Sequence, residues 1–386
     1  MLRAALRRMP LPVPDATLLA AALLLLGIGL LMVASASVAT AESLTGEPLY
    51  FFYRQLAYAL VGVAAGAAAL LIPSTAWERS GFALMAFAVF LLLIVLIPGV
   101  GVEVNNAQRW IDLGLVRVQA SEPARLAIIM YLAGYVVRQQ LELQHRIRGV
   151  LRALLPVCGA CVLMLTQPDY GATAVLLAVV FVMLFLGGAR LGSLLAIGGV
   201  VAAGLAVLAT TAPYRLARLL SFRDPWADIN NAGWQLAQSL IAIGRGEVTG
   251  VGLGNSVQKL LYLPEQHTDF IFAIYAEELG LVGVAALLSL FALVVWRGFS
   301  IGAEAERLGR LFQAYLVYGI SFWFAIQALI NMAVNTGLVP TKGLTLPLIS
   351  FGGSSLVVSC VSLALVLRVG YENRRVGNAA PSGVPA

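Results

Sequence analysis

The chain has 386 residues, of which 60% are hydrophobic and only 11% are charged. A soluble domain is typically about 25% charged and about 45–50% apolar, so this composition excludes an ordinary soluble protein and indicates a membrane protein. The net charge of +6 does not indicate nucleic acid, because the sequence lacks basic patches with interleaved aromatic residues. Two His and three Cys argue against a structural zinc site or a disulfide scaffold.

Apolar runs close to twenty residues long recur along the chain and predict membrane helices. We therefore expect an all-α polytopic membrane protein with ten transmembrane helices and with one large and one smaller extracytoplasmic loop. The predicted spans are residues 16–38, 56–72, 82–97, 122–138, 151–166, 172–187, 191–211, 269–296, 312–334 and 346–367. The first run is longer than the roughly 7–15 residues of a signal-peptide core, so we interpret it as an uncleaved helix.

The distribution of Lys and Arg predicts how these spans are oriented, because cytoplasmic loops carry an excess of basic residues. Ten spans put both termini on one side, and most of the basic residues fall on that side. The short loops on the other side hold only Arg54, Arg109, Arg117 and Lys342. This bias places both termini in the cytoplasm and the two substantial loops outside.

The predicted topology divides the chain into three parts. Residues 1–15 form a cytoplasmic N-terminal segment, and residues 369–386 form a cytoplasmic C-terminal tail. The membrane domain covers residues 16–368 and includes a large periplasmic loop at about 212–268. A connection of that length is too long to be a simple linker, so we expect it to carry function.

Ionisable groups gather where the large outer loop meets the eighth span, in residues 262–280. Glu265, His267 and Asp269 lie within one turn of each other there, and Asp169 starts the sixth span from the same side. Ionisable groups at membrane depth are costly and mark candidate functional sites. A transporter usually binds its substrate near the bilayer midplane. Chemistry at the outer surface instead favours an enzyme whose substrate has a lipid tail and an external polar head.

Each of these residues also has a structural interpretation. Asp269 alone is as well explained as a cap of the eighth span, because Asp and Thr side chains accept hydrogen bonds from free N–H groups at helix starts. Thr268 could provide the cap instead and leave Asp269 free. Glu265 could be a solvated loop charge, and His267 could be a satisfied polar residue. Arg109 and the adjacent Trp110 could be an interfacial anchor.

Other polar features favour structural roles. Glu277 and Glu278 lie inside the eighth span and are best explained by pairing with a neighbouring helix. Glu122 and Arg125 are three residues apart, so they can pair on one helix face. The glycine-rich segment 244–254 lacks the pattern of a phosphate-binding loop. We favour a tight irregular segment there over a backbone nest that accepts a phosphate.

Several motifs carry a family resemblance: Met32–Ser37, Arg109–Gly114, Gln167–Ala172, Asn255–Lys259, Leu263–Ala273 and Pro340–Pro347. Through them the chain, from about residue 16 to residue 372, resembles the SEDS (shape, elongation, division and sporulation) family. The segment PTKGLTLP favours the division branch, since the elongation branch usually has a Val-rich segment there. Two departures concern Asn106, where the family usually has Gly, and Pro123, a displaced proline that should alter the start of the fourth span.

The resemblance implies a ten-helix bundle that polymerises lipid II into peptidoglycan strands on the outer face of the bacterial inner membrane, at the division septum. The family's catalytic aspartate falls on Asp269, which would act as general base on the 4-hydroxyl of the acceptor's N-acetylglucosamine. That oxygen would attack the anomeric carbon of the donor's muramyl sugar, with inversion, and undecaprenyl pyrophosphate would leave. Lys342, Arg109 and Trp110 would line the substrate cavity.

The remaining candidate substrate-binding residues are Glu265, in a loop that the resemblance links to activation, and His267, Arg215 and Ser354. The sequence shows no cofactor or metal motif, and the need for a divalent cation (Mg²⁺ or Mn²⁺) is left open. The implied partners are lipid II, the nascent glycan strand, a septal class B penicillin-binding protein and other divisome membrane proteins. The alternative functions are a lipid II flippase and a non-catalytic divisome scaffold.

Overall fold

The computed structural model describes residues 14–379 except for positions 105–106, 113, 115–116, 211–221, 223, 228, 230, 232 and 341–342. Each of the ten predicted spans overlaps a helix, although several ends differ by a few residues or more. These helices are α2 (Ala16–Thr45), α3 (Tyr50–Leu71), α5 (Gly81–Ile94), α6 (Ser121–Arg138), α8 (Ile147–Thr166), α9 (Tyr170–Leu186), α10 (Leu191–Thr210), α13 (Ile271–Arg307), α14 (Leu311–Asn335) and α15 (Gly353–Ala379). Shorter helices connect them: α4 (Ser74–Arg79), α7 (Gln140–His145) and α12 (Trp234–Gly246).

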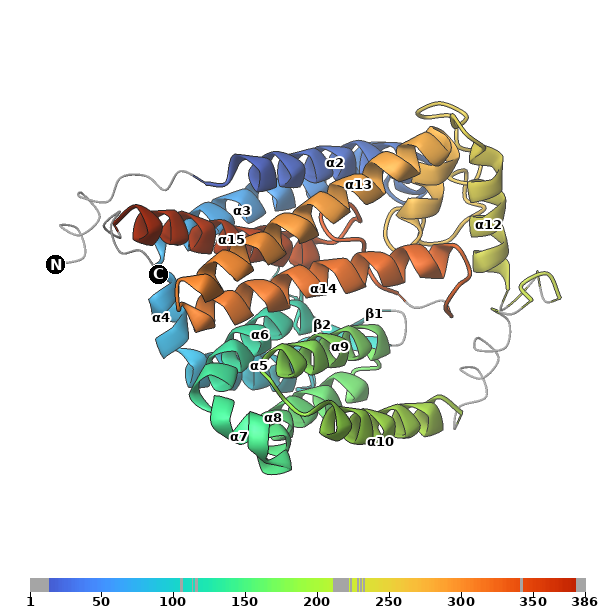
Figure 1. The fold of residues 1–386 in the computed structure, drawn as a ribbon. Coiled ribbons are helices and arrows are strands. Elements are labelled where there is room, and N and C mark those ends of the chain that lie inside the picture. Colours follow the sequence, from blue (N-terminus) through green and yellow to red (C-terminus); the bar gives the residue numbers. More distant parts are fainter. Residues whose placement is uncertain are drawn as a thin grey trace.

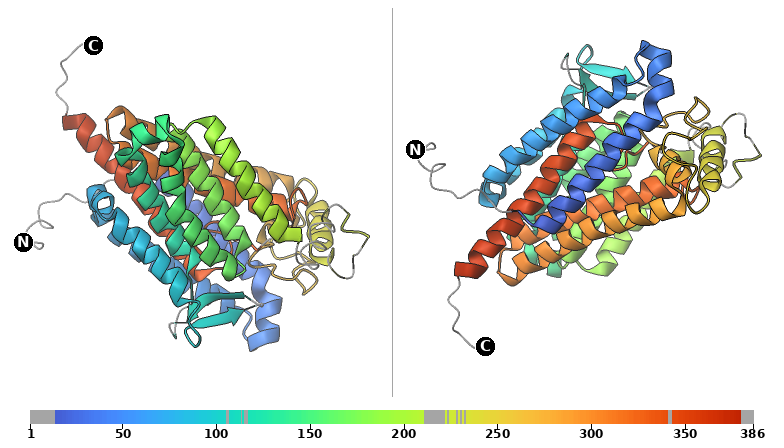
Figure 2. Two further views of the ribbon diagram at one scale, coloured as in Figure 1. Left: turned by 90° about the horizontal axis from the view of Figure 1, so that it is seen from below. Right: turned by 90° about the horizontal axis from the view of Figure 1, so that it is seen from above.

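The long helices lie side by side in one bundle (Figure 1). Six of the described helices are long and apolar enough to cross a membrane, and three shorter apolar helices accompany them. The start of α2 and the end of α15 lie at one end of the bundle, whereas α12 lies at the other (Figures 1 and 2). The α12 end is named the outer end here, after the orientation predicted from the charge bias. Exposed apolar side chains such as Phe82, Leu195 and Val200 cover the outer helices. This surface suits lipid, and the chain is a multi-pass membrane protein.

An all-α prediction leaves the smaller outer loop without regular structure, but the loop contains β-strands. It forms a three-stranded antiparallel sheet in the order β1 (Gly101–Val104), β2 (Ala107–Asp112) and β3 (Arg117–Gln119). These strands are three to six residues long, so they gave no strong alternating pattern in the sequence. The sheet is small, but it carries Arg109 and Trp110.

The last membrane helix begins seven residues later than predicted, at Gly353 rather than at residue 346. The intervening apolar residues form turns, in which Leu348 has a positive φ of 65° and the Ser350 hydroxyl accepts a hydrogen bond from the Leu346 N–H (2.8 Å). Apolar composition marked this segment as part of a span, although its backbone is not helical. It instead forms part of the outer end of the bundle.

Helix α6 carries a buried charged pair of its own. Arg125 is 1% exposed and lies 3.4 Å from Glu122, so the predicted pairing on one helix face is confirmed. Its guanidinium also donates to the side-chain oxygen of Gln327 on α14 (2.7 Å) and lies over the ring of Trp323. A buried cation is stable only with such partners, so α6 and α14 depend on each other.

Helix α13 consists of two segments that meet at Gly280, where φ is +63°. The segment after α12 packs into this break, and the N–H groups of Val251 and Gly252 donate to the carbonyls of Glu277 and Glu278 (3.0 Å each). A Cβ on Gly280 would lie 2.3 Å from the nitrogen of Gly250, so side chains are excluded there. The glycine-rich run is thus the tight irregular segment that its sequence favoured.

The two glutamates before this break anchor the outer loop. Glu277 accepts a hydrogen bond from the backbone N–H of Val257 (3.1 Å). Glu278 pairs with Lys259 (2.9 Å) and accepts from the Ser35 hydroxyl of α2 (2.7 Å). Both carboxylates are fully buried. The expected pairing with a neighbouring helix is therefore confirmed for Glu277, whose carboxylate lies 3.8 Å from Arg245 of α12. For Glu278 it holds only for the Ser35 contact, because its ionic partner comes from the loop.

Removal of the Glu278 carboxylate tests this anchor. Glu278→Ala leaves the Lys259 ammonium buried without its counter-charge, and breaking a buried ion pair from one side typically costs about 3–5 kcal/mol. We expect a lower unfolding midpoint in detergent. The matched double variant Lys259→Met/Glu278→Leu removes both charges and should lose less stability. A wild-type midpoint for Glu278→Ala would show that the ion pair does not anchor the loop.

Candidate active site

Asp269 lies in the last turn before α13, and its carboxylate does not cap that helix. The cap comes from Asn335 of α14, whose Oδ1 accepts a hydrogen bond from the N–H of Ala273 (3.2 Å). Thr268 does not cap the helix either, since its hydroxyl donates to the carboxylate of Glu265 (2.6 Å). Within the described ranges, no hydrogen bond occupies the Asp269 carboxylate, so it can accept one from a ligand.

Burial and the surrounding charges set the pKa of Asp269 near neutrality. The residue is half-buried, and the protein atoms packed around its carboxylate disfavour the ionised form. The negative charge of Glu265 raises the pKa further, Arg109 of β2 lowers it, and Asp169 raises it, with a net pKa of about 7. A carboxylate with a pKa near the operating pH is well suited to act as a general base.

Asp169 holds Arg109 at this site. The Nη1 of Arg109 lies 3.8 Å from Asp169 Oδ1, and Asp169 is 2% exposed. The other carboxylate oxygen accepts hydrogen bonds from Gln119 (3.0 Å) and from Ser121 (2.7 Å). Asp169 therefore has a fixed orientation and in turn positions Arg109. The Arg109 side chain is 25% exposed, so it stays accessible at the site. Asp169 was not among the predicted site residues, although its place at the outer start of a span was a signal.

Trp110 and Ser354 differ in what they contact. Trp110 is half-buried beside Arg109, and its indole N–H has no hydrogen-bond partner among the described residues. The Ser354 hydroxyl accepts from the N–H of Gln119 (2.9 Å) and donates to the carbonyl of Arg117 (3.2 Å). Ser354 thus attaches β3 to the start of α15 and supports the sheet. A direct contact between Ser354 and substrate stays a prediction.

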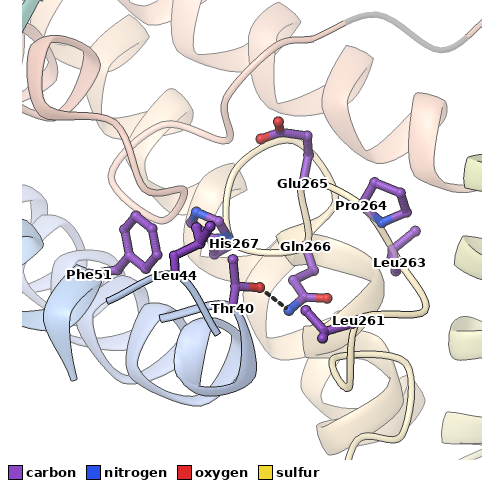
Figure 3. Close-up of a pocket in the computed structure, with 9 residues that line it drawn as sticks. All are labelled: Thr40, Leu44, Phe51, Leu261, Leu263, Pro264, Glu265, Gln266 and His267. Carbon is purple, nitrogen blue, oxygen red and sulfur yellow. Dashed lines mark hydrogen bonds between the residues drawn. The ribbon is translucent and has the colours of Figure 1, made fainter. Parts of the chain in front are cut away.

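Glu265 and His267 line a pocket of about 420 Å³ between the outer ends of α2 and α3 and the loop at 261–267 (Figure 3). Asp269 is not among its lining residues. The His267 ring packs against Phe51 and Phe351, at centroid distances of 4.5 and 5.6 Å. Burial lowers the pKa of His267, and the nearby Glu265 only partly opposes this shift. A neutral, packed His267 fits a role in holding the loop.

The segment after Lys342 passes directly against Asp269. A Cβ on Gly343 would lie 2.8 Å from Asp269 Oδ2, so the absence of a side chain makes room for the carboxylate. The carbonyl of Leu344 accepts from the side chain of Asn331 (2.6 Å), which fixes this approach. Lys342 itself lies outside the described residues, as does Arg215. Their predicted contacts with substrate stay predictions.

The residues brought together here are those that the family motifs marked. A family model described as "Cell cycle protein" (FTSW_RODA_SPOVE) matches residues 16–375. The chain belongs to this family. It is the SEDS family that the sequence resembles, and the match runs from the start of α2 into the last turns of α15.

Relatives in the family are similar over nearly their whole length. The "Probable peptidoglycan glycosyltransferase FtsW" of Thioalkalivibrio sulfidiphilus is 52% identical, over 94% of this chain and 91% of the relative. The protein of the same name in Legionella pneumophila is 49% identical, over 95% of this chain and 93% of the relative. The similarity therefore includes the outer loops as well as the helices.

Solved structures of the family share the fold. One, described as "Structural coordination of polymerization and crosslinking by a peptidoglycan synthase complex", has a TM-score of 0.76 at 27% identity and covers 94% of this chain and 98% of that chain. The rod shape determining protein RodA of Thermus thermophilus has a TM-score of 0.69 at 26% identity, with the same coverage. The bundle and its outer end are thus a family architecture.

Proposed function

We propose that this protein is a peptidoglycan glycosyltransferase that polymerises lipid II into glycan strands. The observation that carries the proposal is the Asp269 carboxylate, which has a pKa of about 7, lies beside Arg109 and Gly343, and is not used as a helix cap. Its place at the end of the bundle opposite the start of α2 suits a lipid-anchored substrate. Relatives named as glycosyltransferases over nearly the whole chain support the same activity.

Asp269 acts in this mechanism as the general base. It accepts the proton of the acceptor's N-acetylglucosamine 4-hydroxyl while that oxygen attacks the anomeric carbon of the donor's muramyl sugar. Undecaprenyl pyrophosphate leaves with inversion at that carbon. Positive charge near the leaving group favours this step, and Arg109 and Lys342 are the cations that we assign to it. Trp110, Glu265, His267, Arg215 and Ser354 complete the proposed binding region, with Ser354 acting through the sheet.

A divalent cation, Mg²⁺ or Mn²⁺, would add positive charge for the pyrophosphate. Among the described residues, no group of three or more His, Cys, Asp or Glu side chains is placed to hold a metal ion. We therefore assign no step of the mechanism to a divalent cation.

The proposed setting is the division septum of the bacterial inner membrane, with both termini in the cytoplasm. The charge bias of the loops supports this orientation. The proposed partners are a septal class B penicillin-binding protein, which crosslinks the new strands, and other membrane proteins of the divisome. The similar solved structure, described as a complex for polymerisation and crosslinking, supports a crosslinking partner.

Polymerisation of lipid II by the purified protein with its partner tests the proposal directly. Asp269→Asn removes the base but keeps the size of the side chain, and we expect the rate to fall by about 10²–10⁴-fold. The variant must be folded and bound to its partner. Normal polymerisation by Asp269→Asn would show the assignment to be wrong. A reconstituted flipping assay on the same variant separates the enzyme from a flippase.

The pH dependence of kcat/KM tests the electrostatics of the site. Ionised Asp269 is the active form, so the rate should rise with pH through an apparent pKa of about 7. Glu265→Gln removes a charge that raises this pKa and should shift the acidic limb to lower pH. Arg109→Gln removes a charge that lowers it and should shift the limb to higher pH. Shifts in the same direction for both variants would mean that these two charges do not set the pKa of the base.

Gly343→Ala tests the close approach to the carboxylate. The added methyl would lie 2.8 Å from Asp269 Oδ2, and the carboxylate is the group that can move. We expect a folded protein whose polymerisation rate is lower by roughly 10–100-fold, because small misplacements of a reacting group are costly. Gly352→Ala is the matched control, since its methyl would make only ordinary contacts of 3.5 Å or more. Equal rates for the two variants would contradict the expected displacement.

A further inference from the structure

The side chain of Asn335 takes the place of one helical hydrogen bond. In a regular helix, the N–H of Ala273 would bond to the carbonyl of Asp269, four residues earlier. Here that N–H donates to the carbonyl of Phe270 (3.0 Å) and is shared with the Asn335 Oδ1 (3.2 Å), while the Asn335 Nδ2 donates to the Asp269 carbonyl (3.1 Å). The amide therefore contacts both groups and satisfies the carbonyl that the helix leaves without its N–H partner. Asp269 stays beside α13 but outside its first turn.

Asn331 adds a second donor to the same carbonyl. Its Nδ2 lies 2.9 Å from the oxygen of Asp269 and 2.6 Å from the oxygen of Leu344. A carbonyl oxygen has two lone pairs, so the two amides together fill its hydrogen-bonding capacity. Asn331 thus links the loop that carries the carboxylate to the segment that passes against it.

The two amides have a rigid support. Asn331 and Asn335 are one helical turn apart on α14, so they lie on one face of that helix. Asn331 is 1% exposed and Asn335 is fully buried. The carbonyl of Asn335 also accepts from the Ser239 hydroxyl of α12 (2.8 Å), which ties this end of α14 to the outer loop.

We propose that Asn331 and Asn335 are positioning residues that fix the backbone of Asp269, and with it the carboxylate, between Arg109 and Gly343. The inference rests on the proposed function, in which Asp269 is the general base. Neither amide needs to touch the substrate. A change of about 1 Å in the position of a reacting group can cost about 10²-fold in rate, so the backbone contact has a direct kinetic consequence.

The same contact keeps the carboxylate among particular charges. The charged groups that face Asp269 are Glu265 on its own loop, Arg109 on β2 and Asp169 at the start of α9. The α14 face contributes neutral amides, and Lys342 lies outside the described residues. Release of the backbone would let the carboxylate move towards water, and its pKa would fall towards the ordinary value for Asp.

The test compares Asn331→Ala and Asn335→Ala with the wild-type protein in lipid II polymerisation with the partner. We expect kcat to fall by about 10–100-fold while KM changes by less than about threefold, because the transition state rather than substrate binding is affected. The acidic limb of kcat/KM against pH should move to lower pH. Asn331→Leu keeps a side chain of similar size but removes the amide donor. It replaces Asn331→Ala in the test if the alanine variant does not fold.

Asn373→Ala is the matched control. Asn373 is another fully buried asparagine, and its Nδ2 donates to a backbone carbonyl, that of Ile301 (3.0 Å). It lies in the last turns of α15, at the end of the bundle opposite α12 and therefore away from Asp269 (Figure 1). The control should lose stability as the other variants do, but keep the wild-type kcat and the wild-type pH limb.

The outcomes separate this inference from the proposed function. Folded Asn331 and Asn335 variants with a wild-type kcat and pH limb, beside an inactive Asp269→Asn, would overturn the positioning role and leave the function intact. If the Asn331 and Asn335 variants lose no more kcat than Asn373→Ala and the acidic limb of kcat/KM does not move, their role is merely structural. That result would also overturn the positioning role. An active Asp269→Asn would overturn the function itself.

Discussion

Backbone N–H and C=O groups that are shielded from water must find partners within the protein, and this requirement shapes the outer end of the bundle. Helix α13 begins there and is broken again at Gly280, so its exposed backbone groups are satisfied from elsewhere. Asn335 bonds to the start of the helix, and the segment after α12 bonds to the break. The loop that carries Asp269 lies between these two attachments and has little freedom.

Charge at the site is balanced rather than simply positive. Arg109 pairs with Asp169 and lowers the pKa of Asp269, whereas Glu265 and Asp169 raise it. A site built only to bind pyrophosphate would hold more cations. Together with the burial of its carboxylate, this balance keeps the pKa of Asp269 high enough for it to take up a proton near neutral pH, while Arg109 still offers a positive charge.

The helices could be predicted from sequence because lipid demands long apolar runs, and Arg and Lys marked the loops between them. Asp269 was also within reach as an ionisable residue at the start of the predicted eighth span, and Arg109 through the family motif in the smaller loop. The break at Gly280, the start of α15 and the cap by Asn335 could not be predicted, because each depends on hydrogen bonds between residues distant in sequence. Asn331 and Asn335 are visible in the sequence as two amides one turn apart in an apolar span. Their role could not be predicted, because the sequence does not show that the Asp269 loop is their hydrogen-bond partner.

Arg125 constrains the order in which the bundle is completed. Its guanidinium is buried in α6, and its shortest hydrogen bond goes to Gln327, which lies 202 residues later in the chain. During synthesis α6 therefore enters the membrane with only Glu122 of its own helix to offset the charge. A buried cation in lipid is costly until it is paired. The Arg125 guanidinium therefore reaches its final partners only once α14 has joined the bundle, so α14 must be in place before the surroundings of α6 are complete.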